Sequence, residues 1–158
     1  MPGRRLPVDG FKSLCSNDCV VSRGRILAVD YGRRNIGLAC SDELGLTVRP
    51  LPSIPNHGRK DFLGRLRAAV RSMGIREIVL GMPLNMDGTR GQAVARMERL
   101  TGILKLALKV PLTGVDERLS TVEALELWRA MSPKQQKKYR TVDSLAAALI
   151  LERYLGET

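Results

Sequence analysis

Residues 25–30 form a nearly continuous apolar run that ends at an acid, Asp30. A strand that is apolar on both sides, without alternation, belongs inside a sheet that is covered on both faces. A turn containing Gly32 follows, and residues 36–40 form a second apolar run. The two runs therefore predict a hairpin whose first strand lies at the centre of a layered α/β domain.

The rest of the chain alternates between strand-like and helix-like periodicity. Three more strands are expected, at 47–51, 77–81 and 111–116. Helices are expected at 60–73, 91–108, 120–128 and 142–155. Pro50 and Pro52 assign the strand at 47–51 to an edge, because proline cannot donate a ladder hydrogen bond. With right-handed crossovers, these elements predict a mixed five-stranded sheet, flanked by helices, with spatial order 3-2-1-4-5.

The domain organisation follows from length and composition. The chain has 158 residues, of which 44% are hydrophobic, enough for one domain with a single core. Residues 1–23 mix Pro, Gly, Ser, Asn and charged residues without a period, so we expect a flexible leader before a single domain at 24–158. No run of 18 apolar residues and no signal-peptide pattern is present, which predicts a cytoplasmic protein.

The charge balance of the chain favours a polyanionic partner. Lys and Arg number 26 against 16 Asp and Glu, giving a formal net charge of +10. Nucleic acid is the commonest partner of such a chain, although a basic surface can also serve solubility alone. The chain has only 3 Tyr, 2 Phe and 1 Trp, which argues against a stacking platform for single strands.

Cysteine and histidine usage does not favour a zinc centre. The chain has three cysteines, Cys15, Cys19 and Cys40, and a single histidine, His57. Nothing in their spacing brings His57 near Cys15 and Cys19. Cys40 ends an apolar run and is interpreted as a small core residue.

Three acids stand where apolar segments begin or end: Asp30, Glu117 and Asp143. If the first and last strands lie near each other and the last helix crosses their ends, the three carboxylates converge. Carboxylate oxygens suit a hard cation, so Mg²⁺ or Mn²⁺ is the expected metal, with all three acids as ligands and catalytic residues. Asp116 and Glu117 face opposite sides of their strand, and we choose Glu117 as the ligand.

Each acid also has a purely structural interpretation. Asp30 can serve turn geometry, and Glu117 can interact favourably with a helix N-terminus. Asp143 can be an ordinary acid in the first turn of its helix, with Thr141 as the cap. These alternatives remain open at the level of sequence.

Basic residues close to the three acids are candidates for binding phosphate groups. Arg33 and Arg34 follow Asp30, and Arg118 follows Glu117. A basic loop before Asp143 contains Lys137, Lys138 and Arg140. Guanidinium groups bind phosphate through paired hydrogen bonds, and such a loop can follow a nucleic-acid backbone, although basic loops are usually just solvated. The glycine-bounded loop at 81–88 is a weaker candidate for approaching a phosphate.

Four motifs in this order resemble the YqgF (RuvX) family: D-x-G-x-x-x-I-G from Asp30, G-x-P-x-x-x-x-G from Gly81, D-E-R-L-S from Asp116 and D-x-x-A-A from Asp143. The resemblance implies a ribonuclease H-like fold related to the junction resolvase RuvC. It also implies a nuclease that matures ribosomal small-subunit RNA or resolves DNA junctions. The acidic triad of the family falls on Asp30, Glu117 and Asp143. Family members often carry Gly-Arg-X before the last acid, whereas residues 139–142 here are Tyr-Arg-Thr-Val.

The functional hypothesis is metal-dependent hydrolysis of phosphodiester bonds in structured RNA or branched DNA, with maturation of the 5′ end of pre-16S rRNA as the first choice. Resolution of four-way DNA junctions is an alternative, and so is a non-catalytic RNA- or ribosome-binding factor. An ATPase of the sugar-kinase and actin type is a further alternative, but it needs a second lobe for which the chain has little room. Ribosomal precursor particles are a further expected partner. The sequence leaves open whether the chain is a monomer or a homodimer, and junction resolution requires two active sites.

Overall fold

The structure is a computed structural model that describes residues 5–6, 24–83, 91–117 and 120–156. Arg118, Cys15, Cys19, most of the expected leader and most of the loop at 81–88 lie outside the described residues.

In these described ranges, six strands form one mixed sheet in the order β1-β6-β5-β2-β3-β4. Their bounds are β1 Arg5–Leu6, β2 Arg25–Tyr31, β3 Asn35–Ser41, β4 Val48–Pro55, β5 Ile75–Met82 and β6 Leu112–Asp116. The central strands β2, β5 and β6 run parallel to one another. On the other side of β2, β3 pairs antiparallel with β2, and β4 pairs antiparallel with β3. The five expected strands occur in the expected order, so the predicted α/β fold is confirmed. The sequence analysis did not predict β1, which pairs antiparallel with β6.

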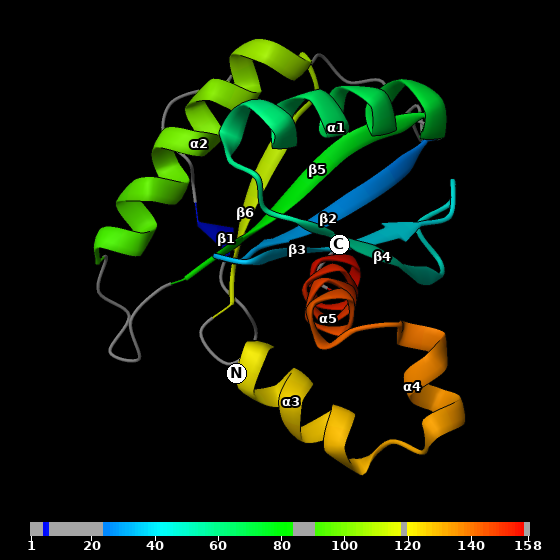
Figure 1. The fold of residues 1–158 in the computed structure, drawn as a ribbon. Coiled ribbons are helices and arrows are strands. Elements are labelled where there is room, and N and C mark those ends of the chain that lie inside the picture. Colours follow the sequence, from blue (N-terminus) through cyan, green and yellow to red (C-terminus); the bar gives the residue numbers. More distant parts are fainter. Residues whose placement is uncertain (1–4, 7–23, 84–90, 118–119, 157–158) are drawn as a thin grey trace.

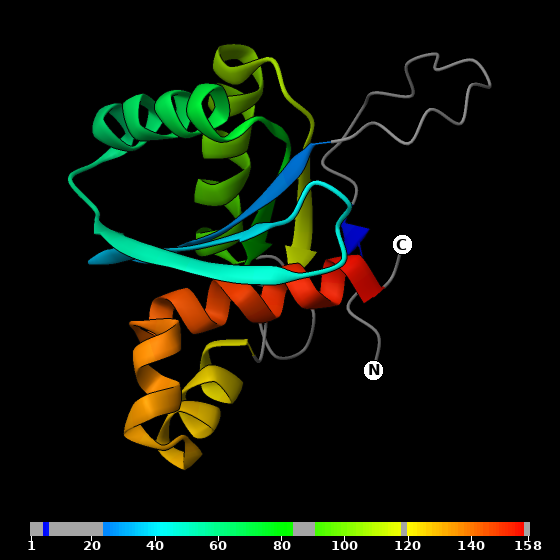
Figure 2. The same cartoon turned by 90° about the vertical axis from the view of Figure 1, so that its right-hand side faces the viewer.

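Helices cover both faces of the sheet. The helix α1 (Arg59–Met73) and the helix α2 (Gln92–Leu108) cover one face, and α5 (Val142–Gly156) crosses the other (Figure 1). The helix α3 (Ser120–Ala130) and the helix α4 (Pro133–Tyr139) pack against the side of α5 that faces away from the sheet (Figure 2). No helix in the described part of the chain is long and apolar enough to span a bilayer.

The central strand is buried on both faces, as its sequence predicts. Leu27 and Val29 belong to the core beneath α1 and α2, and Ile26 and Ala28 belong to the core beneath α5. All four side chains are at most 1% exposed. This alternation matters for function, because it places the next residue of β2, Asp30, on the face that α5 covers.

The helix α4 corrects one sequence interpretation. Residues 133–139, which the sequence analysis described as part of a basic loop, form this short helix. The Ser132 side chain accepts a hydrogen bond from the backbone N–H of Gln135, and the Gln135 side chain accepts one from the backbone N–H of Ser132. This reciprocal capping, with Pro133 in the first turn, stabilises a helix start that hydrophobic periodicity alone does not indicate.

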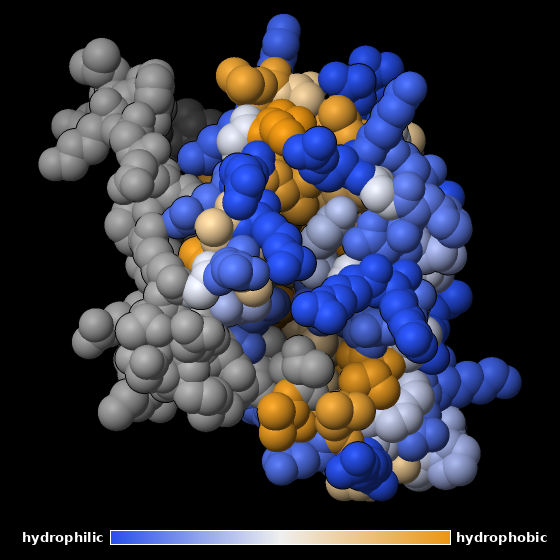
Figure 3. All heavy atoms as spheres, turned by 60° about the vertical axis from the view of Figure 1, so that its left-hand side comes forward, coloured by the Kyte–Doolittle hydropathy of each residue, from blue (hydrophilic) through white to orange (hydrophobic). Residues whose placement is uncertain are grey.

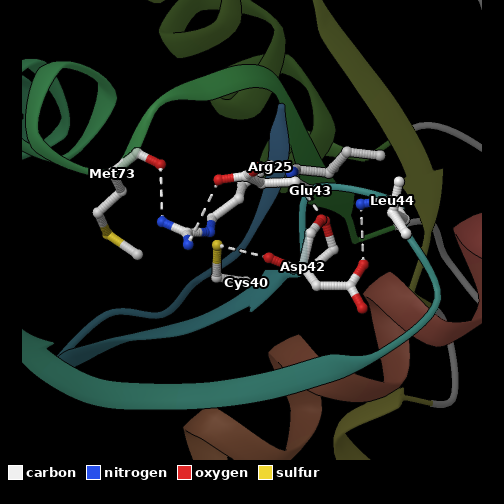
Figure 4. Close-up of polar contacts among 8 residues, drawn as sticks. Arg25, Cys40, Asp42, Glu43, Leu44 and Met73 are labelled. Atoms are coloured by element: carbon white, nitrogen blue, oxygen red, sulfur yellow. Dashed lines mark hydrogen bonds and ion pairs between the residues drawn. The ribbon is translucent and has the colours of Figure 1, made fainter. Parts of the chain in front are cut away.

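The N-terminal end of β2 is tied to its neighbours through Arg25 (Figure 4). Its guanidinium donates a hydrogen bond to the Met73 carbonyl at 3.2 Å and lies 3.8 Å from the carboxylate of Glu43. Cys40 is buried nearby with 2% exposure, and burial raises the pKa of its thiol. The interpretation of Cys40 as a core residue is therefore confirmed.

Asp42 stabilises the turn between β3 and β4, at the opposite end of β3 from the turn that follows Asp30. Its carboxylate accepts hydrogen bonds from the backbone N–H of Leu44 at 3.1 Å, which Figure 4 shows, and of Leu46 at 2.9 Å. The Thr47 hydroxyl donates a third bond at 2.7 Å. These donors lower the pKa of Asp42. The fold thus gives this acid a structural role.

Candidate active site

The carboxyl ends of the three parallel strands meet at one edge of the sheet, and two of the predicted acids lie there. Asp30 is the penultimate residue of β2, and Glu117 directly follows β6. The backbone N–H of Glu117 donates to the Met82 carbonyl at 3.2 Å, so β5–β6 pairing continues through Glu117. Val115 lies in the core under α5, and strand alternation therefore turns Glu117, two residues later, toward the same face as Asp30.

The side chains of Asp30 and Glu117 form a hydrogen bond to each other. Burial, the negative charge of Asp30 and that of Asp116 raise the pKa of Glu117 to about 8. Burial and the charge of Asp143 raise the pKa of Asp30 to about 6. Because two negative charges in one buried site repel each other, the metal-free pair favours a form in which one of the two carboxyls keeps its proton near neutral pH.

Asp143 lies in the first turn of α5 and close enough to Asp30 for its charge to act on that residue. The Thr141 hydroxyl oxygen accepts the backbone N–H of Ser144 at 3.1 Å, so Thr141 caps this helix as expected. The Ser144 hydroxyl donates to the Leu51 carbonyl at 2.6 Å and fastens the start of α5 to β4. Helix capping and packing together position Asp143 beside the Asp30–Glu117 pair.

Two glycines of the sequence motifs allow this close approach. A Cβ atom at Gly81 would overlap the Glu117 carboxylate and lie 2.9 Å from the Ile150 side chain. A Cβ atom at Gly37, which pairs with Asp30, would overlap the backbone carbonyl of Asp143. Only glycine leaves space for the Glu117 side chain over β5 and for the start of α5 over β3.

The structure brings the predicted acids together to different degrees. Asp30 and Glu117 are in contact, and Asp143 acts on Asp30 through its charge. In the described ranges, no three His, Cys, Asp or Glu side chains are close enough to form a metal-binding group. Asp116 is only 6% exposed, and the side chain of Glu117 interacts with that of Asp30.

An open cleft of about 1000 Å³ lies in front of Asp30 and Glu117. Its walls come from the turn after β2, the start of α1 and the N-terminal half of α2. Figure 3 views the side of the molecule where α2 lies and shows hydrophilic side chains gathered across it. Among the described residues, four arginines line the cleft: Arg33, Arg59, Arg96 and Arg99.

The sequence analysis named one of these four arginines, Arg33. It missed Arg59, Arg96 and Arg99, and it also missed Asn56, which lines the same cleft. Helical periodicity places arginines of this kind on the polar side of their helices. It does not reveal which end of the sheet that side overlooks.

The other predicted basic residues that the structure describes lie outside the cleft lining. Arg34 is exposed in the turn between β2 and β3. Lys137, Lys138 and Arg140 are exposed in or just after α4, which lies next to the N-terminal end of α5 (Figure 2). The Lys138 ammonium lies 5.6 Å from the centre of the Tyr139 ring. Lys137, Lys138 and Arg140 lie on the α5 side of the acids, opposite to the α1 and α2 side.

Comparison with known proteins now adds to this geometry. Residues 24–157 match the family described as "RuvX: Holliday junction resolvase". The chain belongs to the RuvX family. This RuvX chain is 39% identical over 131 residues to a Syntrophus aciditrophicus protein, covering 83% of this chain and 87% of that one. It is 40% identical over 133 residues to a Geobacillus kaustophilus protein, covering 83% and 96%. Both relatives are named "Putative pre-16S rRNA nuclease".

Solved structures support the fold of the RuvX chain. The fowlpox virus Holliday junction resolvase aligns with a TM-score of 0.51 at 14% identity, covering 85% of this chain and 99% of that one. The complex of the fowlpox virus resolvase with junction DNA aligns with a TM-score of 0.52 at 12% identity, covering 84% and 97%. The family resemblance and the ribonuclease H-like fold predicted from the sequence are confirmed.

The residues at the sheet edge fit a divalent cation. Asp30 and Glu117 supply only oxygen donors, which suits Mg²⁺ or Mn²⁺ better than Zn²⁺. Burial and the neighbouring negative charges raise the pKa values of both acids, so positive charge at this site would favour their ionised forms. A cation bound there would replace the proton that the metal-free pair keeps and restore the ionised form of both acids.

Proposed function

We propose that this RuvX chain is a metal-dependent endonuclease that cleaves phosphodiester bonds in structured nucleic acid, and that it matures the 5′ end of pre-16S rRNA. The observation that carries the proposal is the buried Asp30–Glu117 pair at the bottom of an arginine-lined cleft. The names of the relatives support the substrate. Residues 24–158 would form the nuclease domain, and ribosomal precursor particles in the cytoplasm would be its partners.

Asp30, Glu117 and Asp143 are the residues proposed to hold Mg²⁺ or Mn²⁺ and to act in catalysis. When bound, the cation lowers the pKa of a coordinated water and stabilises negative charge on the phosphate. Glu117 would give up its proton on binding, and Asp30 would then be fully ionised. Asp143, on α5, would complete the oxygen ligands from the side opposite the cleft.

The basic residues would orient the substrate. Arg33 lines the cleft beside Asp30, where its guanidinium can bind a phosphate through two hydrogen bonds. Arg34, Arg118, Lys137, Lys138 and Arg140 are proposed to contact the backbone outside the cleft. Backbone contacts carry no sequence information, so the fold of the substrate would decide where the chain cuts.

Resolution of four-way DNA junctions is a second candidate, because the description of the family names that activity. This function would require a homodimer with two active sites, whereas rRNA maturation is compatible with a monomer. A non-catalytic RNA-binding factor is the rival from another class. It would keep the cleft arginines but show no metal-dependent cleavage.

A cleavage assay separates these functions. The full chain is incubated with Mn²⁺ and either precursor 16S rRNA or a four-way DNA junction, with EDTA and the Asp30→Asn variant as controls. We expect cleavage of the rRNA that EDTA and Asp30→Asn both abolish, while the variant still binds RNA. Cleavage of the junction alone would favour the second candidate. Equal cleavage by Asp30→Asn, in a preparation free of other nucleases, would contradict both.

A further inference from the structure

We propose that a nucleic-acid backbone lies in the cleft across Arg59, Arg96 and Arg99, on the α1 and α2 side of the acids. This inference rests on the proposed function and adds the binding path of the substrate. It places the path on the opposite side from α4, in or next to which three of the six predicted basic residues lie, Lys137, Lys138 and Arg140.

The charge distribution of the cleft supports this path. Asp30 and Glu117 are the only acids among the described residues that line it, and both carboxyls are mostly buried. The lining arginines are all exposed. Within the described ranges, Arg33, Arg59 and Arg96 form no ion pair with an acid. Their charges are therefore available to a ligand with several negative charges.

The positions of these arginines suit an extended polyanion. Arg96 and Arg99 are three residues apart on α2, so they project from neighbouring positions of one helix face. Arg59 is the first residue of α1, across the cleft. A row of guanidinium groups that leads to the acids matches successive phosphates of one strand better than a single small anion.

The start of α2 strengthens the positive potential at the same wall. This helix has no acid in its first turn, and its N-cap residue, Gly91, makes no side-chain capping bond. Gln92 and Ala93, from that first turn, line the cleft together with Arg96. The partial positive charge of the helix end therefore adds to that of the arginines.

Asn56 links the turn between β2 and β3 to the start of α1. Its side-chain amide donates to the Gly32 carbonyl at 2.8 Å, and its side-chain oxygen accepts the backbone N–H of Gly58 at 3.0 Å. The backbone N–H of Asn56 also donates to the Arg34 carbonyl at 2.8 Å. These bonds connect the turn that carries Arg33 to the start of α1, so the arginines from the two elements keep a fixed separation.

The cleft lacks the means to read bases by stacking. Tyr31 is the one aromatic residue among the described lining residues, and its ring packs against Phe62 with centroids 5.0 Å apart. A ring that is engaged with the core is not a platform for a base. The cleft therefore offers contacts to phosphates, and the proposed partner is the backbone of a nucleic acid.

The test measures binding without catalysis. A fluorescently labelled RNA hairpin and a labelled four-way DNA junction are titrated with full-length chain in EDTA at several salt concentrations, by fluorescence anisotropy. The variant carries Arg59→Ala, Arg96→Ala and Arg99→Ala. The matched control carries Arg67→Ala, Arg71→Ala and Arg129→Ala, which removes the same charge from exposed positions outside the cleft.

We expect the cleft variant to bind RNA about 10- to 100-fold more weakly than the control, with the slope of log K against log salt lower by about two to three. A cleft variant that binds within about threefold of the control would overturn the inference. So would a wild-type chain that binds neither probe. Circular dichroism and thermal melting verify that both variants fold. The binding assay contains no metal, so it tests the binding path alone. The cleavage assay with Mn²⁺ tests the proposed activity separately.

Discussion

At the scale of single residues, the Glu117 carboxyl is mostly buried over Gly81, next to a second carboxyl that repels its charge. Such a position disfavours ionisation in the metal-free chain. The same position favours the ionised form of Glu117 once positive charge is supplied next to it. The local environment of Glu117 therefore couples protonation, cation binding and stability.

This coupling predicts how stability depends on pH in the metal-free chain. The pKa of Glu117 rises from 4.5 to about 8 on folding, and that of Asp30 rises from 3.8 to about 6. The folded chain therefore keeps protons that the unfolded chain releases, and the free energy of unfolding falls as pH increases through this range. Between pH 5 and pH 8 we expect a loss on the order of 5 kcal/mol, most of it from Glu117, measured by urea unfolding in EDTA.

The Glu117→Gln variant isolates the source of that pH dependence. Glutamine is uncharged and nearly isosteric, so most of the fall in stability between pH 5 and pH 8 should disappear, and the variant should exceed wild type in stability at pH 8. A variant that retains the wild-type pH dependence would assign the effect to other groups.

Gly81 is predicted to matter for activity more than for folding. In Gly81→Ala the new methyl group displaces the Glu117 carboxylate, so the cleavage rate should fall at least 10-fold. The free energy of unfolding should decrease by only about 1–3 kcal/mol relative to wild type. The control is Gly102→Ala, an exposed position of α2 with open space around it. There alanine should stabilise the helix by about 0.5–1 kcal/mol without changing cleavage. Equal activity of the two variants would contradict the account.

The acids could be found from the sequence, because each stands at the end of an apolar segment and topology brings such ends together. The cleft arginines could not. Arg59, Arg96 and Arg99 come from two helices, and their shared direction depends on how these helices pack on the sheet. Nothing in the local sequence of any one of them differs from that of an ordinary surface arginine.

At the scale of elements, the site depends on segments that hold one another in place. Asn56 joins the β2–β3 turn to α1 through its side-chain bonds to Gly32 and Gly58. The helix α5 is fastened at its start by Ser144 and, farther along, by an ion pair between Arg153 and Glu123 of α3. The β2–β3 turn with Arg33 and the helix that carries Asp143 are thus anchored by separate contacts.

Removing the Asn56 side chain should loosen the first of these connections. For Asn56→Ala we expect a loss of about 1–2 kcal/mol in the free energy of unfolding and a weaker affinity for RNA, because the turn with Arg33 and the start of α1 are no longer linked. Asn35→Ala, at an exposed neighbouring position, is the control for both measurements. If the two variants behave alike, the Asn56 bonds contribute nothing to the cleft.

Elements were predictable where hydrophobic patterning determines them. The burial of β2 on both faces followed from its unbroken apolar run, and the strand order followed from crossover handedness. The strand β4 continues past the predicted end at residue 51 to Pro55, because prolines are tolerated in an edge strand. The helix α4 was missed because its buried face is small and reciprocal capping at Ser132, rather than periodicity, defines its start.

At the scale of the whole molecule, the net charge of +10 attracts nucleic acid, and the two basic regions flank the acids from opposite sides. One region is the cleft under α1 and α2, and the other is the surface of α4. Long-range attraction would bring a substrate to either region, but only the cleft leads directly to Asp30 and Glu117.

The cation site is the claim on which the rest depends, and titration calorimetry with Mn²⁺ near neutral pH, in two buffers of different ionisation enthalpy, tests it directly. The account predicts that the wild-type chain binds Mn²⁺ with release of a proton, which Glu117 supplies, and that Asp30→Asn loses at least 10-fold in affinity. Binding of Mn²⁺ to Asp30→Asn with wild-type affinity, or no binding to the wild-type chain, would contradict it.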